Sequence, residues 1–368
     1  MRILVLFGGE SVEHEISVIS ANQVINAMKV NYSVLPLYIG KDNKFYYRED
    51  LDCLEIYKNI SKITCNKNEV KICRKNKKNY LKFKGIRKKK FFDFAFIVVH
   101  GKGMEDSTLL SYLKFKKIPV IADSLSFYAL AQNKALTKRV LNDLEIKNSS
   151  FIELYKGESI SGLEFPVIIK PNTLGSSIGI SKAGNEEELE MALQEAFKYD
   201  KKVIVEEFLE DSKEFNISVV EKDGEILTSN IEEVVKDSDV LDYSQKYEGH
   251  KNVKGMASSK REVPAKISEN IKTEIEEIAK KIYYHFEAKG VIRIDFLYNK
   301  GKVYVNEINS IPGSYAFYLW KGKMDFVELL DTVIDTGKKD IFKENKIIKS
   351  IDKMDIFKNY KNNSSKFK

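Results

Sequence analysis

RILVLFGGESVEHEIS, residues 2–17, combines an apolar run, a pair of glycines and the start of a helical pattern. The apolar run at 2–7 predicts a buried parallel strand. Gly8 and Gly9 allow a tight backbone turn after it, and helical spacing continues over 17–29. A strand, a glycine turn and a helix in this order are typical of a doubly wound α/β sheet, which we expect at the N-terminus.

The segments downstream of this opening extend the same α/β pattern. Short apolar runs predict strands at 33–39, 92–99 and 118–122, and helices are expected at 106–117 and from Ser124 onward. Residues 41–92 are rich in lysine and have no clear period, which we interpret as irregular α/β structure with edge strands.

The second half of the chain predicts a different mixture of elements. Strands are expected at 166–170, 178–181, 202–207, 214–221, 225–229, 291–298 and 303–308, and helices at 133–143, 185–198, 266–287 and 325–335. The polar stretch 236–262 has no period, and a loop of this length is usually functional or disordered. The tail from about residue 346 is rich in lysine and asparagine, so we expect its end to fray.

The composition indicates a globular protein with a sizeable core. Its 368 residues are 43% hydrophobic and 31% charged. Its apolar stretches are too short for a membrane span or a secretion signal. Cys53, Cys65 and Cys73 lack metal-ligand spacing, so we interpret them as free thiols in a reducing cytoplasm. The net charge of +7 suits an anionic partner such as a nucleotide, and no nucleic-acid-binding motif is present.

A loop after a predicted strand has the residue types of a phosphate-binding loop. KPNTLGSSIG at 170–179 begins with Lys170 and continues with glycines and serines. Backbone N–H groups and the hydroxyls of Ser176 and Ser177 can surround phosphate oxygens, while the lysine supplies a positive charge. The GxxxxGK[ST] pattern of a Walker loop is absent, and a flexible hairpin is the alternative interpretation.

Charged and amide side chains on a predicted hairpin suggest a magnesium site. Residues two apart on a strand face the same side, so Arg293 shares a face with Asp295. Glu307 and Asn309 likewise share a face, and a short turn brings Asp295 near Glu307. Two carboxylates and an amide oxygen suit Mg²⁺, with Arg293 placed for a phosphoryl group or an oxyanion. The alternative is a surface salt-bridge cluster, which the apolar flanking residues disfavour.

Two acidic stretches are further candidates. Glu13 can hold a substrate ammonium group at the start of the first helix, and the alternative is helix capping by Glu15 and Ser17. VEEF at 205–208 can contact the edge of an adenine, and the alternative is an ordinary strand end with two solvated acids.

Taken in chain order, these motifs resemble the D-alanine–D-alanine ligases, a family of the ATP-grasp superfamily. The resemblance covers about residues 3–335. It is carried by FGGESVEHEIS at 7–17, HGKGMEDSTL at 100–109, NK at 133–134, FPVIIKPNTLGSSIGISK at 165–182, VIVEEFLE at 203–210, EF at 214–215, QKY at 245–247, GVIRIDF at 290–296 and VNEINSIPG at 305–313.

The resemblance implies an α/β protein in which a doubly wound parallel sheet precedes an ATP-grasp fold of two α+β subdomains. The implied parts are an N-terminal domain at 1–128, a central subdomain at 129–208, a C-terminal subdomain at 209–345 with a mobile loop at 236–262, and a basic tail at 346–368.

The resemblance also implies a role for each matching residue. ATP is bound by Lys134, Lys170, Ser176, Ser177, Glu206, Glu207, Phe208, Leu209, Glu214 and Lys246. Two Mg²⁺ ions, or Mn²⁺ in their place, are held by Asp295, Glu307 and Asn309. Glu13 binds the ammonium group of the first D-alanine and joins Ser176 and Tyr247 in closing the mobile loop. Arg293 and the backbone N–H of Gly313 steady the reaction intermediates.

The implied reaction has two steps and supplies D-Ala-D-Ala for peptidoglycan. The carboxylate of the first D-alanine attacks the γ-phosphorus of ATP, which gives an acyl phosphate and ADP. The amine of the second D-alanine then attacks the acyl carbon and expels phosphate. The implied partners are D-alanine, ATP and a second copy in a homodimer, in the cytoplasm, with neither nucleic acid nor membrane.

Two departures from the family pattern leave the second substrate open. In HGKGMEDSTLLS at 100–111, four positions that the family fills with glycine or glutamine carry other residues. The aromatic run at 315–320 also places Tyr318 where a small hydroxyl residue is expected to hold the second substrate. D-serine, D-lactate or another amine therefore stays an alternative acceptor, although Tyr247 favours the dipeptide reaction.

Two functions of other classes are disfavoured. A non-catalytic nucleotide-binding paralogue has little use for the complete set Asp295, Glu307 and Asn309. A dinucleotide-binding oxidoreductase is disfavoured because Gly8-Gly9 is not part of a GxGxxG motif.

Overall fold

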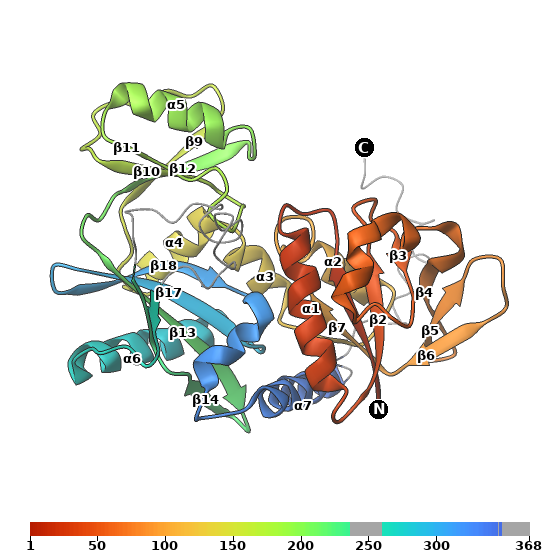
Figure 1. The fold of residues 1–368 in the computed structure, drawn as a ribbon. Coiled ribbons are helices and arrows are strands. Elements are labelled where there is room, and N and C mark those ends of the chain that lie inside the picture. The colour runs from red at the N-terminus through yellow and green to blue at the C-terminus, as the bar shows by residue number, and fades with distance from the viewer. Residues whose placement is uncertain (236–259, 345, 348–368) are drawn as a thin grey trace, which may run out of the picture.

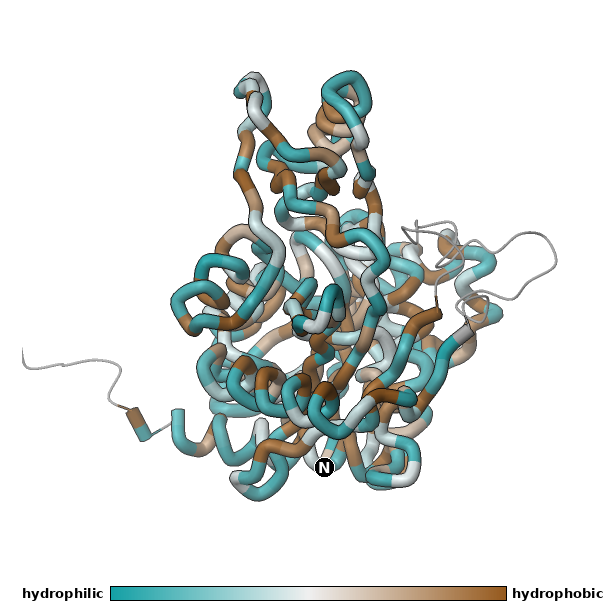
Figure 2. Tube along the Cα trace, turned by 90° about the vertical axis from the view of Figure 1, so that its left-hand side faces the viewer, coloured by the Kyte–Doolittle hydropathy of each residue, from teal (hydrophilic) through white to brown (hydrophobic). Residues whose placement is uncertain are grey.

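The computed structural model describes residues 1–235, 260–344 and 346–347 (Figure 1). Their strands form three sheets of eight, four and six strands. One continuous apolar core joins the first and third sheets, whereas the second sheet has a separate core. Figure 2 shows the unit of the second sheet standing above the wider body of the molecule. This arrangement confirms the expected order of a parallel sheet followed by two smaller α/β units.

The first sheet confirms the predicted opening of the chain. Its parallel strands are β1 (Arg2–Gly8), β2 (Ser33–Ile39), β7 (Phe94–Val98) and β8 (Val120–Ile121), in the order β2-β1-β7-β8. The stretch expected to be irregular supplies β3 (Phe45–Tyr46), β4 (Glu69–Lys75), β5 (Lys78–Phe83), β6 (Lys89–Phe92) and the 3₁₀ turns η1 (Leu54–Lys62) and η2 (Asn66–Asn68). These strands extend the sheet on its β2 side in antiparallel fashion. The helices of this region are α1 (His14–Met28), α2 (Thr108–Phe115) and α3 (Leu125–Ala131).

Helix α1 begins at His14, three residues before the predicted start, and the interpretation of Ser17 as a cap is wrong. The Ser17 hydroxyl accepts from the Gly8 N–H at 2.8 Å and donates to the Val98 carbonyl at 2.6 Å. It therefore links α1 to the ends of β1 and β7. Glu15 lies in the first turn of α1 and forms an ion pair with Lys41.

The second sheet carries the loop predicted to bind phosphate. It consists of β9 (Phe151–Tyr155), β10 (Val167–Pro171), β11 (Ser181–Ala183) and β12 (Lys202–Glu207), with the helices α4 (Lys134–Asp143) and α5 (Glu186–Ala196). The strand expected at 178–181 is wrong, because β11 begins at Ser181. Ser176 and Ser177 have positive φ angles of 54° and 58°, and the N–H groups of Ile178 and Ile180 bond back into the loop. A turn therefore occupies the expected strand.

The third sheet confirms the predicted hairpin. It consists of β13 (Lys213–Lys222), β14 (Glu225–Thr228), β15 (Glu232–Val235), β16 (Lys260–Glu262), β17 (Ile292–Asn299) and β18 (Lys302–Asn309). Helix α6 (Glu269–His285) belongs to this unit, and α7 (Phe326–Glu344) packs against both β13 and β8. Helix α7 ends nine residues after its predicted end at 335. No helix of the described part of the chain is long and apolar enough to cross a membrane.

A left-handed turn opens the 3₁₀ segment η5 (Gly313–Trp320). Ser314, Tyr315 and Ala316 have φ angles of 50°, 55° and 48°, which L-residues adopt at a cost of roughly 1–2 kcal/mol each. Two contacts with the first sheet unit offset this cost. The Tyr315 hydroxyl donates to the Ile97 carbonyl at 2.8 Å, and the Ser314 N–H donates to the Ser20 hydroxyl at 3.0 Å.

Candidate functional site

Glu13 and Ser176 meet although 163 positions separate them in the chain. Ser176, in the loop after β10, donates its hydroxyl to the Glu13 carboxylate at the start of α1. A Cβ atom on Gly175 would lie 2.9 Å from Glu13, and one on Gly101 would lie 2.7 Å away. Glycine at these two positions therefore lets two loops close around the carboxylate. Burial raises the pKa of Glu13, nearby Glu105 adds to this effect, and the Ser176 hydrogen bond opposes it.

His100 and Glu105 belong to this cluster, although neither of them was predicted to have a role. The Glu105 carboxylate accepts from the Ser310 hydroxyl at 2.7 Å, the Ile311 N–H at 3.0 Å and the Gly101 N–H at 3.1 Å. It thus ties the end of β7 to the segment after β18. Burial raises the pKa of Glu105 despite these hydrogen bonds and lowers that of His100. Their position directly after a buried strand is the signal that could have identified them.

A buried carboxylate with two lysines lies at the second sheet. Glu206, which is 2% exposed, accepts at its Oε2 atom from Ser149 at 2.7 Å and Lys170 at 3.0 Å, with Lys138 at 3.3 Å. Burial alone would raise the pKa of Glu206, but Lys170 and Lys138 outweigh it and lower that pKa. Its Oε1 atom has no hydrogen-bond partner among the described residues. The alternative of a solvated acid is therefore wrong for Glu206.

Lys138 and Ser149 were not predicted. Lys138 follows Lys134 by four residues and therefore lies on the same face of α4, which is the signal that could have identified it. Burial lowers the pKa of its ammonium group, while Glu206 opposes this shift. Nothing in the local sequence marks Ser149 as a partner of a residue 57 positions later.

Lys134 and Lys170 bridge the second and third sheet units. The Lys134 ammonium group donates to Glu307 at 2.7 Å and to the Leu174 carbonyl at 2.7 Å. The Lys170 ammonium group donates to the Asn306 amide oxygen at 3.1 Å as well as to Glu206. The two lysines predicted for phosphate therefore project toward the end of β18 that carries the predicted metal ligands.

The remaining residues predicted for ATP lie along the end of β12 and the start of β13. Glu207 is exposed and accepts from the Ser150 hydroxyl at 3.0 Å. The Phe208 ring lies 4.3 Å from the Lys182 ammonium group, and Leu209 is half-buried beside it. Glu214 is half-buried on β13, opposite Leu297. Ser177 follows Ser176 in the loop, whereas Lys246 and Tyr247 lie outside the described residues.

The predicted pairing across the β17–β18 hairpin is confirmed. Asp295 lies opposite Glu307, and Arg293 lies opposite Asn309. The Arg293 guanidinium donates twice to Asp295, at 2.7 and 2.8 Å. Burial opposes the charge of Arg293, but Asp295 outweighs it and raises the pKa of Arg293 well above its usual range. Asp295 is itself buried, so the alternative of a surface salt-bridge cluster is wrong.

These residues fit a divalent cation. Within the described ranges, no three His, Cys, Asp or Glu side chains gather as a metal group, so a cation here would rely on two carboxylates and an amide. The Asn309 amide nitrogen lies 3.2 Å from the Asp295 carboxylate, and a half-turn of that amide would present its oxygen instead. Asp295, Glu307 and Asn309 thus form a compact set of hard oxygen donors, which Mg²⁺ prefers.

A row of polar side chains crosses the third sheet from one side to the other. Glu232 on β15 pairs with Asn216 on β13, Asn216 with Asp295 on β17, and Asp295 with Glu307 on β18. The first three are buried. We call these four residues the transverse polar row. One end of the row is Glu307, which contacts Lys134, and the other end is Glu232, which contacts Arg261.

The aromatic run at 315–320 is turned mostly into the core. Tyr315 and Trp320 are buried, and the Trp320 indole N–H donates to the Ser218 hydroxyl at 3.1 Å. Tyr315 and Trp320 therefore contribute to the core of the protein. Tyr318 is half-buried and donates to Glu232 at 3.1 Å, so it faces the transverse polar row. A Cβ atom on Gly313 would meet no other atom of the described residues within 4 Å, so they leave open space in front of it.

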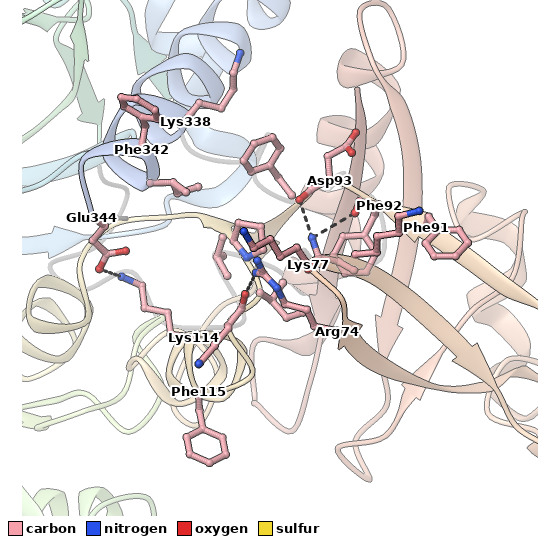
Figure 3. A pocket seen from close by; sticks show the side chains of 18 residues that line it. Arg74, Lys77, Phe91, Phe92, Asp93, Lys114, Phe115, Lys338, Phe342 and Glu344 are labelled. Atoms are coloured by element: carbon pink, nitrogen blue, oxygen red, sulfur yellow. Dashed lines mark hydrogen bonds and ion pairs between the residues drawn. The ribbon is translucent and has the colours of Figure 1, made fainter. Parts of the chain in front are cut away.

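One cavity lies away from these residues. It has a volume of about 1160 Å³ and is lined by parts of β4, β5, β6, β7, α2 and α7, including Arg74, Lys114 and Phe342 (Figure 3). Its lysine and phenylalanine side chains come from the edge of the first sheet, from α2 and from the end of α7. None of the residues predicted for the site lines it.

Family models, a sequence relative and solved structures that resemble this chain are all ligases that act on D-alanine. Family models described as the D-ala D-ala ligase N-terminus and C-terminus match residues 2–122 and 142–335. A D-alanine–D-alanine ligase from Thermosipho melanesiensis is 36% identical, with coverage of 96% of this chain and 97% of the relative. The crystal structure of D-alanine–D-alanine ligase from Helicobacter pylori is 28% identical, with a TM-score of 0.72 and coverage of 92% and 98%. The VanG D-Ala:D-Ser ligase structure from Enterococcus faecalis is 26% identical, with a TM-score of 0.73 and coverage of 91% and 99%.

Proposed function

This chain belongs to the D-alanine–D-alanine ligase family, and from that premise we propose that it joins two D-alanines with ATP through a D-alanyl phosphate. The predicted residues for ATP, for the cation and for the first substrate come from three different sheet units, yet they form one chain of contacts. We propose that these contacts form the active site.

The proposal for ATP rests on the Oε1 atom of Glu206, which has no hydrogen-bond partner in the part of the chain that the structure describes. A buried acceptor without a donor is costly, and the exocyclic amine of adenine is a donor that could satisfy it. The neighbouring lysines support the same assignment. Lys134 and Lys170 now pair with Glu307 and with Glu206, and they could exchange these partners for phosphate oxygens when ATP binds.

The cation proposal rests on the donor set of the β17–β18 hairpin. Asp295, Glu307 and Asn309 would hold Mg²⁺, or Mn²⁺ in its place, next to the lysines that would hold phosphate. Such ions neutralise charge on the phosphates and orient the transferred group. Lys134 already spans the distance between Glu307 and the loop after β10, so phosphate and cation would share one location.

Glu13 is proposed to bind the ammonium group of the first D-alanine. An ammonium ion would lower the raised pKa of the Glu13 carboxyl, because an opposite charge favours the ionised form. The carboxylate of this substrate would then attack the γ-phosphorus, forming a C–O–P linkage while the β–γ bridge breaks to release ADP. Ser176 and Ser177 lie in the loop that would cover the transferring group.

Arg293 and Gly313 are proposed to act in the second step. The amine of the second D-alanine attacks the acyl carbon, loses a proton, and the bond to phosphate breaks. Negative charge develops on the former carbonyl oxygen, which Arg293 and the Gly313 N–H would stabilise. The open space in front of Gly313 leaves room for this group. Lys246 and Tyr247 would complete the closed site, and they stay predictions.

The pathway that uses the product, the oligomeric state and the domain boundaries are proposals as well. The product would supply peptidoglycan synthesis in the cytoplasm, and the enzyme would act as a homodimer. The boundaries 1–128, 129–208 and 209–345 are proposed for its three domains. The shared apolar core of the first and third sheets supports treating the second sheet unit as the part that moves separately.

The deciding experiment measures ADP release from Mg-ATP with D-alanine and identifies the product by mass spectrometry. We expect ADP and phosphate to appear with D-alanine in step with D-Ala-D-Ala, and neither with L-alanine. Addition of D-serine or D-lactate tests the alternative acceptors. Product that forms only with one of them would reassign the acceptor, and no ADP release with any of them would contradict the proposal.

A further inference from the structure

The antiparallel edge of the first sheet carries a concentration of positive charge to which the proposed function gives no role. Residues 67–90 include twelve lysine or arginine residues and one acid, a net charge of +11, whereas the whole chain carries +7. This stretch forms β4, β5 and the start of β6, which Figure 1 shows far from the second sheet unit. The rest of the chain is acidic overall, so the positive charge is a local feature of these strands.

Three of these lysines form one row across the outer face of the strands. Lys71 lies opposite Lys82, and Lys82 lies opposite Lys89, with all three residues exposed. Like charges that face each other directly across strands repel, so this row favours a bound anion. Lysine on an edge strand also discourages contact with other sheets, but only Lys89 lies on the edge strand β6. The strands β4 and β5 are each paired on both sides, so their lysines need another explanation.

An aromatic pair lies next to this lysine row on the same face of the sheet. Tyr80 is two residues from Lys82, and Phe91 is two residues from Lys89, so the side chains point to the same side. Tyr80 and Phe91 lie opposite each other, with ring centroids 5.7 Å apart. The Lys89 ammonium group lies 4.6 Å from the centroid of the Tyr80 ring, whereas Phe91 is 47% exposed. The Phe91 ring is therefore the accessible aromatic surface.

Lysines also follow on the other side of the aromatic pair. Lys75 and Lys78 are exposed and lie opposite each other where β4 turns into β5. The one acid of the stretch, Glu69, already pairs with Lys84 at 3.0 Å. We call the five lysines and the aromatic pair of this face the basic platform. It extends over four residues of β4, which is roughly 13 Å.

The basic platform continues into the cavity shown in Figure 3. Lys78 and Phe91 belong to both, and Arg74 and Lys77 line the cavity beside them. Lys114 of α2 lines it as well. Positive charge therefore extends from the platform into the cavity, and a ligand with several phosphate groups can contact both.

We propose that the basic platform binds single-stranded nucleic acid, with its lysines on phosphate groups and a base stacked on Phe91. Aromatic side chains on a sheet face stack with bases, and neighbouring cations neutralise the phosphates. The expectation of no nucleic-acid partner rested on the absence of a known motif, whereas this surface is assembled by the pairing of three strands. The proposal is independent of the proposed ligation, because the platform contains none of the residues assigned to it.

An anionic membrane would also attract the lysines. Insertion into a bilayer needs apolar side chains that extend beyond the cations. Here the row with Tyr80 and Phe91 lies between lysine rows on the same face, an arrangement that favours a strand of bases and phosphates over a lipid surface.

The test measures fluorescence anisotropy of a labelled twelve-nucleotide oligouridylate with the full chain. We expect a Kd on the order of 10⁻⁶ M in 50 mM salt. If five lysines each neutralise one phosphate, the slope of log K against log salt should be about −3.5. The affinity should then fall about 100-fold between 50 and 200 mM salt.

Two kinds of variant separate the charge from the stacking. Lys71→Gln combined with Lys82→Gln should bring the slope to about −2.1, because two phosphate contacts are lost. Phe91→Ala should weaken binding about 5- to 150-fold at an unchanged slope. Phe91→Leu retains apolar bulk without a π face, so it should weaken binding as Phe91→Ala does, and it serves if the alanine variant does not fold.

Matched controls come from the second sheet unit. Lys156 and Lys201 are exposed and adjacent through a backbone hydrogen bond, so Lys156→Gln combined with Lys201→Gln removes the same charge elsewhere. Tyr155 is exposed and has the Lys202 ammonium group 5.7 Å from its ring centroid, so Tyr155→Ala removes a comparable aromatic side chain. Both controls should leave the affinity and the slope unchanged.

Each other result would overturn the proposal. Absence of binding in 50 mM salt would remove the site. A loss with the lysine variants but none with Phe91→Ala and Phe91→Leu would show a purely electrostatic attraction for polyanions. Tighter binding to vesicles of equal parts phosphatidylcholine and phosphatidylglycerol than to the oligonucleotide would assign the platform to a membrane. Equal losses with the controls from the second sheet unit would place binding outside the platform.

Discussion

Replacing Glu206 by glutamine removes the single carboxylate that faces two buried lysines. The variant keeps the size of the side chain but leaves the ammonium groups of Lys138 and Lys170 without a counter-charge. Lys138 is 2% exposed and keeps its contacts with Ser149 and the Phe151 ring, whereas Lys170 keeps the Asn306 amide. We therefore expect a large local loss of stability in the absence of nucleotide.

The distances from the Glu206 carboxylate to the two ammonium groups determine the size of this loss of stability. At 3.0 and 3.3 Å, each attraction is about 5 kcal/mol at an effective dielectric constant of 20. Desolvation of the three groups opposes most of this energy. Removal of one partner from a buried ion pair costs about 3–5 kcal/mol, and we expect Glu206→Gln to fall in this range. Lys138→Met in the same chain should recover part of the loss, because it removes one uncompensated charge.

The assay is hydrogen exchange of backbone amides, read by peptide. The second sheet has its own core, so the loss should be confined to β10 and β12. Protection there should fall by about 10²- to 5 × 10³-fold, while β1 and β7 keep theirs. Fluorescence of Trp320, the one tryptophan of the chain, reports on the third sheet and should change little.

Glu207→Gln is the matched control, because the neighbouring acid is exposed and its side chain accepts from the Ser150 hydroxyl. It should alter stability by less than about 0.5 kcal/mol. A loss below about 1 kcal/mol for Glu206→Gln would refute the reasoning, since typical surface effects are of that size. Strict additivity of Glu206→Gln and Lys138→Met would refute it as well.

Three further predictions concern the cation, the first substrate and pH. Asp295→Asn should lower Mg²⁺-dependent ADP release by about 10²-fold or more with unchanged circular dichroism, since one proposed cation ligand is lost; near-normal release across a Mg²⁺ titration would remove the cation assignment. Ser176→Ala removes a hydrogen bond that lowers the pKa of Glu13. The acid limb of kcat/KM for the first D-alanine should therefore move to higher pH, and an unmoved limb would argue against Glu13 as the ammonium ligand. Burial raises the pKa of Asp123 from 3.8 to about 6, so the folded protein keeps a proton that the unfolded chain releases, and stability falls as pH rises through that window. Asp123→Asn should gain up to about 3 kcal/mol relative to the unchanged protein between pH 4 and pH 7 in urea unfolding, and a constant difference would contradict this.

Local patterns in the sequence predicted much of the fold. β1 and the β17–β18 hairpin follow from apolar periodicity and a short turn, and both lie where expected. The facing of Asp295 and Glu307 follows from the two-residue period of strands, and the observed register confirms it. These features depend on neighbours in the chain, so the sequence contains the information directly.

Contacts between distant residues could not be predicted in the same way. Glu206 and Ser149 are 57 positions apart, and Tyr318 and Glu232 are 86 apart, so no local pattern links them. Local propensity also misjudged the loop at 178–181, where apolar residues predicted a strand and positive φ angles at two serines make a turn. The tertiary packing of the three units decides these features.

The left-handed turn at the start of η5 has a consequence for how this enzyme can change. Glycine at 314 or 316 would relax the backbone, yet it would also release the segment that carries Gly313 and Tyr318. The buried Tyr315 side chain and its bond to the Ile97 carbonyl hold the turn in place. We therefore expect acceptor specificity to change through substitution of Tyr318 rather than through a new turn conformation. The turn is anchored in the N-terminal sheet, whereas the phenol is held by two side chains. The backbone conformation of this turn is fixed by its packing, whereas the side chain at position 318 can be substituted without changing it.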